Sequence, residues 1–154
     1  MKYPKTAPVK VIIIGAGGTG GYVIPHLYRI GFATERSMRI LVCDGDVVEE
    51  KNLIRQNFVE QDVGRNKAQV LAERYSAAFG IECEYIPRFV ENDDELFQLT
   101  VPDFSQDRWR GIPETQRVIL LGCVDNNKSR QMCHRVFERS SHLVYIDSGN
   151  DEFS

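Results

Sequence analysis

The chain has 154 residues, of which 42% are hydrophobic and 27% charged, and its formal net charge is −3. This length and composition are typical of one globular domain with a single core. The slightly negative charge offers no general attraction to nucleic acid or to an anionic membrane surface. No apolar run approaches the roughly 20 residues that a membrane-spanning helix needs. We therefore expect neither nucleic acid nor a membrane as a partner.

The four cysteines are dispersed along the chain, and none forms a C-x-x-C pair. They are Cys43, Cys83, Cys123 and Cys133. This spacing argues against a structural zinc site and favours buried free thiols. Because no apolar secretory signal precedes the first expected strand, this cysteine usage predicts a cytoplasmic protein.

The first part of the chain predicts a strand, a helix and a second strand. Residues 9–14 form a β-branched run, which is typical of a strand buried on both faces in a parallel sheet. A helical pattern follows over 20–30, with Gly31 as its expected stop, and a second strand over 38–43. The apolar face expected for the helix comprises Val23, Ile24, Leu27 and Ile30.

The alternation of strands and helices continues to the end of the chain. The expected elements are a helix over 67–79 ended by Gly80, a strand over 81–86, a short acidic helix over 91–99, a strand over 117–123, a helix over 127–139 and a strand over 143–147. Residues 101–116 combine prolines, glycine and charges, which predicts a flexible surface insertion. The pattern predicts an α/β, Rossmann-like fold, with a mostly parallel open sheet and helices on both faces.

A glycine-rich turn, Gly15-Ala16-Gly17-Gly18-Thr19-Gly20, joins the first strand to the first helix. Glycines at 15, 17 and 20 allow the backbone to approach a phosphate, and the helix that follows offers unpaired N–H groups. The motif predicts a nucleotide site, and the alternative is a tight turn that binds nothing.

Acidic residues follow the second strand, where parallel sheets bind their ligands. Asp44 could accept both ribose hydroxyls, an arrangement that suits ATP and NAD equally. Asp46 either contacts the ribose or a metal, or forms a turn beside Gly45. These residues therefore support a nucleotide without identifying it.

Cationic and amide side chains between the second strand and second helix favour a triphosphate over a dinucleotide. Asn52, Arg55 and Gln56 lie close together, and Lys67 begins the helix. Arg55 could hold phosphate oxygens bidentately while Lys67 supplies a point charge, and both would stabilise negative charge growing on an attacked phosphate. The alternative is that these are solvated charges near helix ends.

Asp125 follows the fourth strand and is the candidate magnesium ligand. It could instead cap the helix over 127–139. Asn126 and Arg130 flank it and join the candidate site. The complete set of candidate nucleotide-binding residues is Gly15, Gly17, Gly18, Gly20, Asp44, Asp46, Asn52, Arg55, Gln56, Lys67, Asp125, Asn126 and Arg130.

These motifs together resemble the E1-like adenylyltransferases, the superfamily of ThiF, MoeB, HesA and the ubiquitin-activating enzymes. The matching segments are G-A-G-G-T-G (15–20), D-G-D (44–46), N-L-I-R-Q (52–56), D-V-G-R-N-K-A (62–68) and V-D-N-N-K-S-R (124–130). They follow the family's order and approximate spacing, and the combination is most similar to the stand-alone bacterial ThiF-like branch. Residues 1–154 then correspond to a single ATP-binding domain, the N-terminal half of the usual family domain.

The resemblance implies adenylation, dependent on ATP and Mg²⁺, of the C-terminal glycine of a ubiquitin-like or sulfur-carrier protein. Asp44 would hold the ribose, and Asn52, Arg55 and Lys67 would hold the phosphates. Asp125 would bind Mg²⁺, and the catalytic roles would fall to Arg55, Lys67 and Asp125. Such proteins are commonly homodimers or heterodimers.

Two alternatives remain open. The family's crossover loop, its frequent catalytic cysteine and the arginine of its N-terminal helix have no counterpart here, so the domain could be a non-catalytic nucleotide-binding subunit. An NAD-dependent oxidoreductase is supported only by the glycine turn and Asp44. His26, His134 and His142 do not form a convincing catalytic group for it.

Overall fold

The computed structural model describes residues 7–105, 109, 111 and 114–148. Within them, five parallel strands form one sheet in the order β3-β2-β1-β4-β5. The elements are β1 (Val9–Ile14), α1 (Gly18–Thr34), β2 (Met38–Cys43), the 3₁₀ turns η1 (Glu50–Ile54) and η2 (Glu60–Asp62), α2 (Lys67–Phe79), β3 (Cys83–Ile86), α3 (Asp93–Thr100), β4 (Arg117–Gly122), α4 (Asn127–Arg139) and β5 (Leu143–Asp147). The expected Rossmann-like α/β fold is confirmed.

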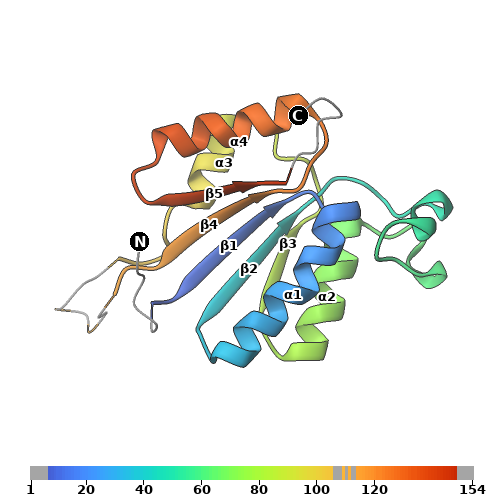
Figure 1. Cartoon of the computed structure of the whole chain (residues 1–154), viewed down its shortest axis with the longest axis horizontal. Coiled ribbons are helices and arrows are strands. Elements are labelled where there is room, and N and C mark those ends of the chain that lie inside the picture. The colour runs from blue at the N-terminus through green and yellow to red at the C-terminus, as the bar shows by residue number, and fades with distance from the viewer. Residues whose placement is uncertain (1–6, 106–108, 110, 112–113, 149–154) are drawn as a thin grey trace.

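The sheet lies between two helical layers, with α1 and α2 on one face and α3 and α4 on the other (Figure 1). Alternate strand residues face opposite layers, so Ile13 packs in the α1/α2 core while Ile12 packs in the α3/α4 core. Among the described residues, no helix has both the length and the apolar character needed to cross a membrane.

The central strand β1 sets the position of the candidate site. All six of its residues are buried, as its β-branched composition predicts for a strand covered on both faces. Ile14 pairs with Cys43 of β2 and with Gly122 of β4, so these three strands end at the same level. The turns that follow them therefore meet at one edge of the sheet.

Helix α1 does not end at Gly31 as expected, but continues to Thr34. A Cβ at Gly31 would lie 3.1 Å from Ile81, so glycine permits close packing there rather than termination. The residue after the helix, Glu35, adopts the left-handed conformation (φ 50°).

The expected apolar face of α1 was also partly wrong. Ile30 is 53% exposed, whereas Tyr28 is fully buried and stacks on Phe79. The sequence pattern placed Ile30 on the buried face, but in the structure Tyr28 is the residue that packs against α2.

The remaining boundaries agree closely with expectation. Helix α2 has the predicted limits, and Gly80 ends it with φ 66°. Helix α3 begins two residues later than expected, because the side chain of Asn92 caps it by accepting from the N–H of Glu95 at 2.8 Å. Strand β3 likewise begins at Cys83 rather than at residue 81.

The predicted insertion over 101–116 lies partly outside the described residues. At its two ends, Asp103 accepts hydrogen bonds from Lys10 at 2.9 Å and from Gln116 at 3.2 Å. Its flexibility stays a prediction.

Candidate functional site

A cleft of about 480 Å³ opens where β1, β2 and β4 end. The chain winds away from β1 in opposite directions toward β2 and β4, so this is the topological switch point, where open α/β sheets bind ligands. The cleft gathers ten of the candidate residues: Gly15, Gly17, Gly18, Asp44, Asp46, Arg55, Gln56, Lys67, Asp125 and Asn126.

The glycines of the turn differ in how closely the rest of the chain packs against them. Gly15 has φ 100°, and a Cβ there would lie 2.5 Å from the carbonyl oxygen of Cys123. A Cβ at Gly20 would overlap the carbonyl oxygen of Gly15. Gly15 and Gly20 are therefore required by packing, whereas a Cβ at Gly18 would meet nothing within 4 Å.

Helix α1 presents its N-terminus to the cleft without a protein cap. Its N-cap residue, Gly17, has no side chain to accept from the first-turn N–H groups, and that turn contains no acidic residue. These N–H groups, together with the helix dipole, form a ready site for an anion such as phosphate.

Asp44 joins the end of β2 to the glycine turn. Its side chain is mostly buried, and its two carboxylate oxygens accept from the N–H groups of Ala16 at 2.6 Å and Asp46 at 2.8 Å. Burial raises the pKa of this carboxyl, while the two hydrogen bonds and Lys67 oppose that rise. Each carboxylate oxygen keeps a further lone pair that could accept from a ribose hydroxyl.

Three polar groups of the cleft lack close protein partners among the described residues. Lys67 is only 6% exposed, yet its Nζ lies 3.7 Å from the Asp46 carboxylate, which is too long for a hydrogen bond. The Oε1 atom of Gln56 is buried and accepts no hydrogen bond. Arg55 is exposed and forms no ion pair within the described chain. The two cationic groups are thus free to bind an anionic ligand, whereas the Gln56 Oε1 atom can only accept a hydrogen bond from a ligand donor.

The residue that caps α4 is Asn126, not Asp125. The Asn126 Oδ1 atom accepts from the N–H of Ser129 at 2.8 Å. The alternative capping role of Asp125 was therefore wrong, and its exposed carboxylate lines the cleft. In the part of the chain that the structure describes, no three His, Cys, Asp or Glu side chains converge as a metal site.

Three candidate residues lie outside the lining of the cleft. Gly20 is buried beneath the turn. Asn52 accepts from the Glu49 N–H through its side chain at 2.8 Å and from the Gln56 N–H through its carbonyl at 2.8 Å, so it shapes the loop. Arg130 donates to Asp147 at 2.9 Å and faces β5. The structure thus gives Gly20 and Asn52 supporting positions, while Arg130 lies apart from the cleft.

Phe89 and Val90 line the cleft but were missed by the sequence reasoning. They follow β3, whose last residue pairs with Cys43 at the end of β2. Gly45 makes room for Phe89, because a Cβ there would lie 2.6 Å from the aromatic ring. Two apolar residues after a short strand resemble ordinary core, so only the strand order could have indicated their place. The other missed side chains in the lining are Ile14, Thr19, Cys43, Cys123, Val124 and Ser129.

The cysteines are free thiols, as expected, but only Cys43 and Cys133 are buried, whereas Cys83 and Cys123 are partly exposed. Burial raises the pKa of Cys43 and of Cys133 to about 12, and that of Cys83 to about 11. Cys123 lines the cleft, and burial raises its pKa as well. All four thiols therefore stay protonated at neutral pH, whereas catalytic thiols have lowered pKa values.

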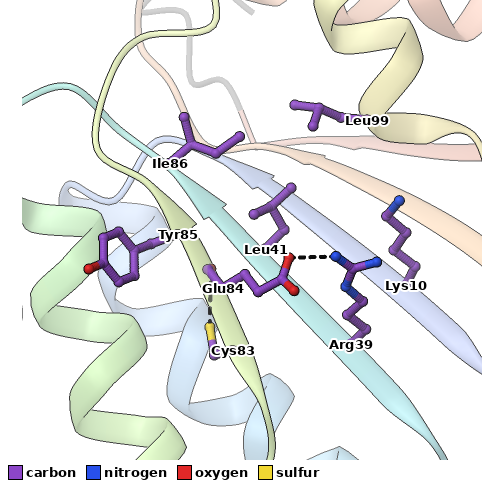
Figure 2. A pocket seen from close by; sticks show the side chains of 8 residues that line it. All are labelled: Lys10, Arg39, Leu41, Cys83, Glu84, Tyr85, Ile86 and Leu99. Carbon is purple, nitrogen blue, oxygen red and sulfur yellow. Dashed lines mark hydrogen bonds and ion pairs between the residues drawn. The ribbon is translucent and has the colours of Figure 1, made fainter. Parts of the chain in front are cut away.

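A second hollow, of about 470 Å³, lies over β1, β2 and β3 on the sheet face that also carries α3 (Figure 2). Its cations are already paired: Arg39 binds Glu84 and Asp103, both at 2.5 Å, and Lys10 binds Asp103. This hollow therefore lacks the free positive charge that the cleft at the strand ends offers.

The sequence profile of the ThiF family matches residues 3–148. The chain is 35% identical over 132 residues to ubiquitin-activating enzyme E1 1 of Candida albicans, which covers 85% of this chain and 12% of that protein. It is 44% identical over 64 residues to the NEDD8-activating enzyme E1 catalytic subunit of Caenorhabditis elegans, which covers 41% of this chain and 14% of that protein.

Among solved structures, E. coli MccB crystallised with ATP matches with a TM-score of 0.62 and 26% identity. The match covers 94% of this chain and 37% of that one, so the chain spans less than two fifths of each of these relatives. Since the family profile covers nearly all of the sequence, the chain belongs to the ThiF family of the E1-like superfamily.

Proposed function

We propose that this chain is the nucleotide-binding part of an enzyme that uses ATP and Mg²⁺ to adenylate the C-terminal glycine of a ubiquitin-like or sulfur-carrier protein. One observation carries the proposal. The buried ammonium of Lys67, the guanidinium of Arg55 and the uncapped N-terminus of α1 line one cleft, and among the described residues none of them donates a hydrogen bond to a carboxylate, the Asp46 oxygen lying 3.7 Å from Lys67. These positive groups suit a triphosphate better than a dinucleotide, and the cleft's aspartates are available for the ribose and a cation.

The cleft offers a separate contact to each part of ATP. Asp44 accepts from the ribose, while Phe89 and Val90 supply an apolar surface for the base. The phosphates would bind along Gly17 and Gly18, in the cleft that Arg55, Gln56 and Lys67 also line. The crystal structure of the E. coli relative MccB with ATP supports this choice of nucleotide.

The exposed carboxylate of Asp125 fits the way proteins usually hold Mg²⁺, and the exposed carboxylate of Asp46 lines the same cleft. This ion is commonly bound by one or two carboxylates, with substrate phosphates and water completing its shell. When bound, it would neutralise phosphate charge. Asp125 would hold the ion in the same cleft that Lys67 and Arg55 line.

In the proposed reaction, a glycine carboxylate oxygen attacks the α-phosphorus. A bond forms between them, and the bond from that phosphorus to the pyrophosphate oxygen breaks. Arg55, Lys67 and the N–H groups of α1 stabilise the negative charge that grows on the α-phosphate oxygens. The acyl adenylate then passes to an acceptor nucleophile, whose attack releases AMP.

ATP–pyrophosphate exchange tests this proposal. The probe is a small ubiquitin-like carrier ending in glycine, and its control is the same carrier without that glycine. We expect exchange only with the complete carrier and Mg²⁺, and tighter binding of ATP than of NAD by calorimetry. Failure to bind ATP, or tighter binding of NAD, contradicts the proposal.

A non-catalytic nucleotide-binding subunit is the second candidate, because the glycine turn, Asp44 and Lys67 could bind a nucleotide without any chemical step. ATP binding, without exchange in the presence of each glycine-tailed carrier tested, favours this candidate.

We further propose assembly as a homodimer or heterodimer. The free thiols support a reducing compartment such as the cytoplasm.

A further inference from the structure

The loop between β2 and α2 must place Arg55 and Gln56 in the cleft with little regular structure of its own. Its 3₁₀ turns are η1 and η2, and Figure 1 shows the loop standing out beyond the strand ends. The isolated bridge from Val47 to Asn66 closes its base. The position of its outer part must therefore be set by side-chain contacts with the neighbouring helices.

Asn57, directly after Gln56, bonds to both helices. Its side-chain amide donates to the carbonyl of Gly21 in α1 at 2.9 Å and to the hydroxyl of Tyr75 in α2 at 2.6 Å. The N–H of Gly21 in turn donates to the carbonyl of Gly17 at 2.9 Å. Asn57 therefore links the loop to the same turn of α1 that carries the glycine motif.

Arg74 of α2 binds the loop at two points. One guanidinium nitrogen donates to the carbonyl of Asn57 at 3.0 Å, and another forms an ion pair with Asp62. Asp62 is only 5% exposed, and its carboxylate also accepts from the N–H of Val59 at 2.8 Å. The Arg74 guanidinium compensates the buried Asp62 carboxylate, which would be costly to leave without a cation. Through its second contact, with the Asn57 carbonyl, Arg74 binds both ends of the segment from Asn57 to Asp62.

We propose that Asn57, Asp62 and Arg74 form a positioning clamp that aligns Arg55 and Gln56 on the triphosphate. None of the three lines the cleft, so they act through the residues they hold. The inference rests on the proposed function. Its physical basis is that a displacement of about 1 Å in a phosphate-binding group can greatly reduce transition-state stabilisation.

Arg74→Lys is the discriminating variant. A lysine keeps the charge beside Asp62, but it lacks the planar fork that reaches the Asn57 carbonyl at the same time. We expect the melting temperature to fall by only a few degrees, ATP affinity to fall about tenfold, and adenosine affinity to change by less than about twofold. Asn57→Ala should give the same selective loss.

Arg65→Lys is the matched control, because Arg65 forms an exposed ion pair with Glu73 of α2 at 2.5 Å and is not bonded to Asn57. It should leave ATP affinity unchanged. The clamp is contradicted if the clamp variants lose ATP affinity and adenosine affinity equally. It is also contradicted if Arg74→Lys folds and keeps its full ATP affinity.

Hydrogen exchange without ligand separates the clamp from the proposed function. The amides of Gln56 and Phe58 are hydrogen-bonded within the loop. Both should exchange faster in Arg74→Lys and Asn57→Ala than in Arg65→Lys. Unchanged exchange in the clamp variants contradicts the clamp, whereas failure of the unmodified chain to bind ATP contradicts the proposed function alone.

Discussion

The carboxylate of Asp44 accepts a hydrogen bond of 2.6 Å from the backbone N–H of Ala16, which ties the end of β2 to the glycine turn after β1. The same carboxylate accepts from Asp46, so one buried side chain orders two turns of the cleft. A residue proposed to bind ribose therefore also builds the site that receives it.

The burial of Asp44 predicts how stability depends on pH. Its pKa is raised in the folded state, so folding favours the protonated form. The contribution of Asp44 to stability should decline as pH rises from about 4, its unfolded pKa, through the higher folded value. Asp44→Asn removes this titration. As pH rises through that range, the unfolding free energy of wild type should therefore fall relative to that of the variant. Urea unfolding at a series of pH values measures it, and a difference that moves the other way contradicts the assignment.

Gly18→Ala and Gly20→Ala should have opposite consequences. A Cβ at Gly20 overlaps the carbonyl of Gly15, so this variant should lose about 3 kcal/mol or more, or fail to fold. Gly18→Ala meets no protein atom and should retain the wild-type stability or gain up to about 1 kcal/mol. Its methyl group would obstruct the phosphates, so ATP affinity should fall. Urea unfolding and calorimetry separate the two effects, and full ATP affinity in Gly18→Ala argues against a phosphate at this turn.

Lys67→Met should weaken ATP binding without weakening the fold. The ammonium is buried with one distant carboxylate, so an apolar chain of similar length should leave stability equal or higher. We expect about a tenfold loss of ATP affinity and little change for adenosine. Lys51→Met, at an exposed lysine paired with Glu49, is the control and should change neither. Equal losses for ATP and adenosine would show that Lys67 does not act on phosphate.

Asp125→Ala and Asn126→Ala should separate magnesium binding from helix capping. Asp125 caps nothing, so its variant should fold normally and lose Mg²⁺-dependent adenylation. Asn126→Ala removes the cap of α4 and should lower the unfolding free energy by about 1 kcal/mol. Thermal unfolding and pyrophosphate exchange measure the two effects. If Asp125→Ala unfolds instead, Asp125 has a structural role and the assignment of the α4 cap to Asn126 alone is contradicted.

Much of the fold was predictable because its signals are local. Continuous β-branched runs mark β1 and β2, and Gly80 marks the end of α2. Gly31 was misjudged because a glycine that stops a helix and one that permits close packing look the same in sequence. The choice depends on Ile81, which lies far along the chain.

Local patterns were enough to locate the glycine turn, the strand ends and the polar residues beyond them, since each depends on neighbours within a few positions. The folded structure was needed to show that Asn126 caps α4 while Asp125 lines the cleft, and that Arg130 binds Asp147 instead of lining it. It alone brought Phe89 beside Gly45 and joined Asn57 to Gly21. The physical reason is that these contacts depend on strand order and on packing between distant elements, which local residue patterns do not encode.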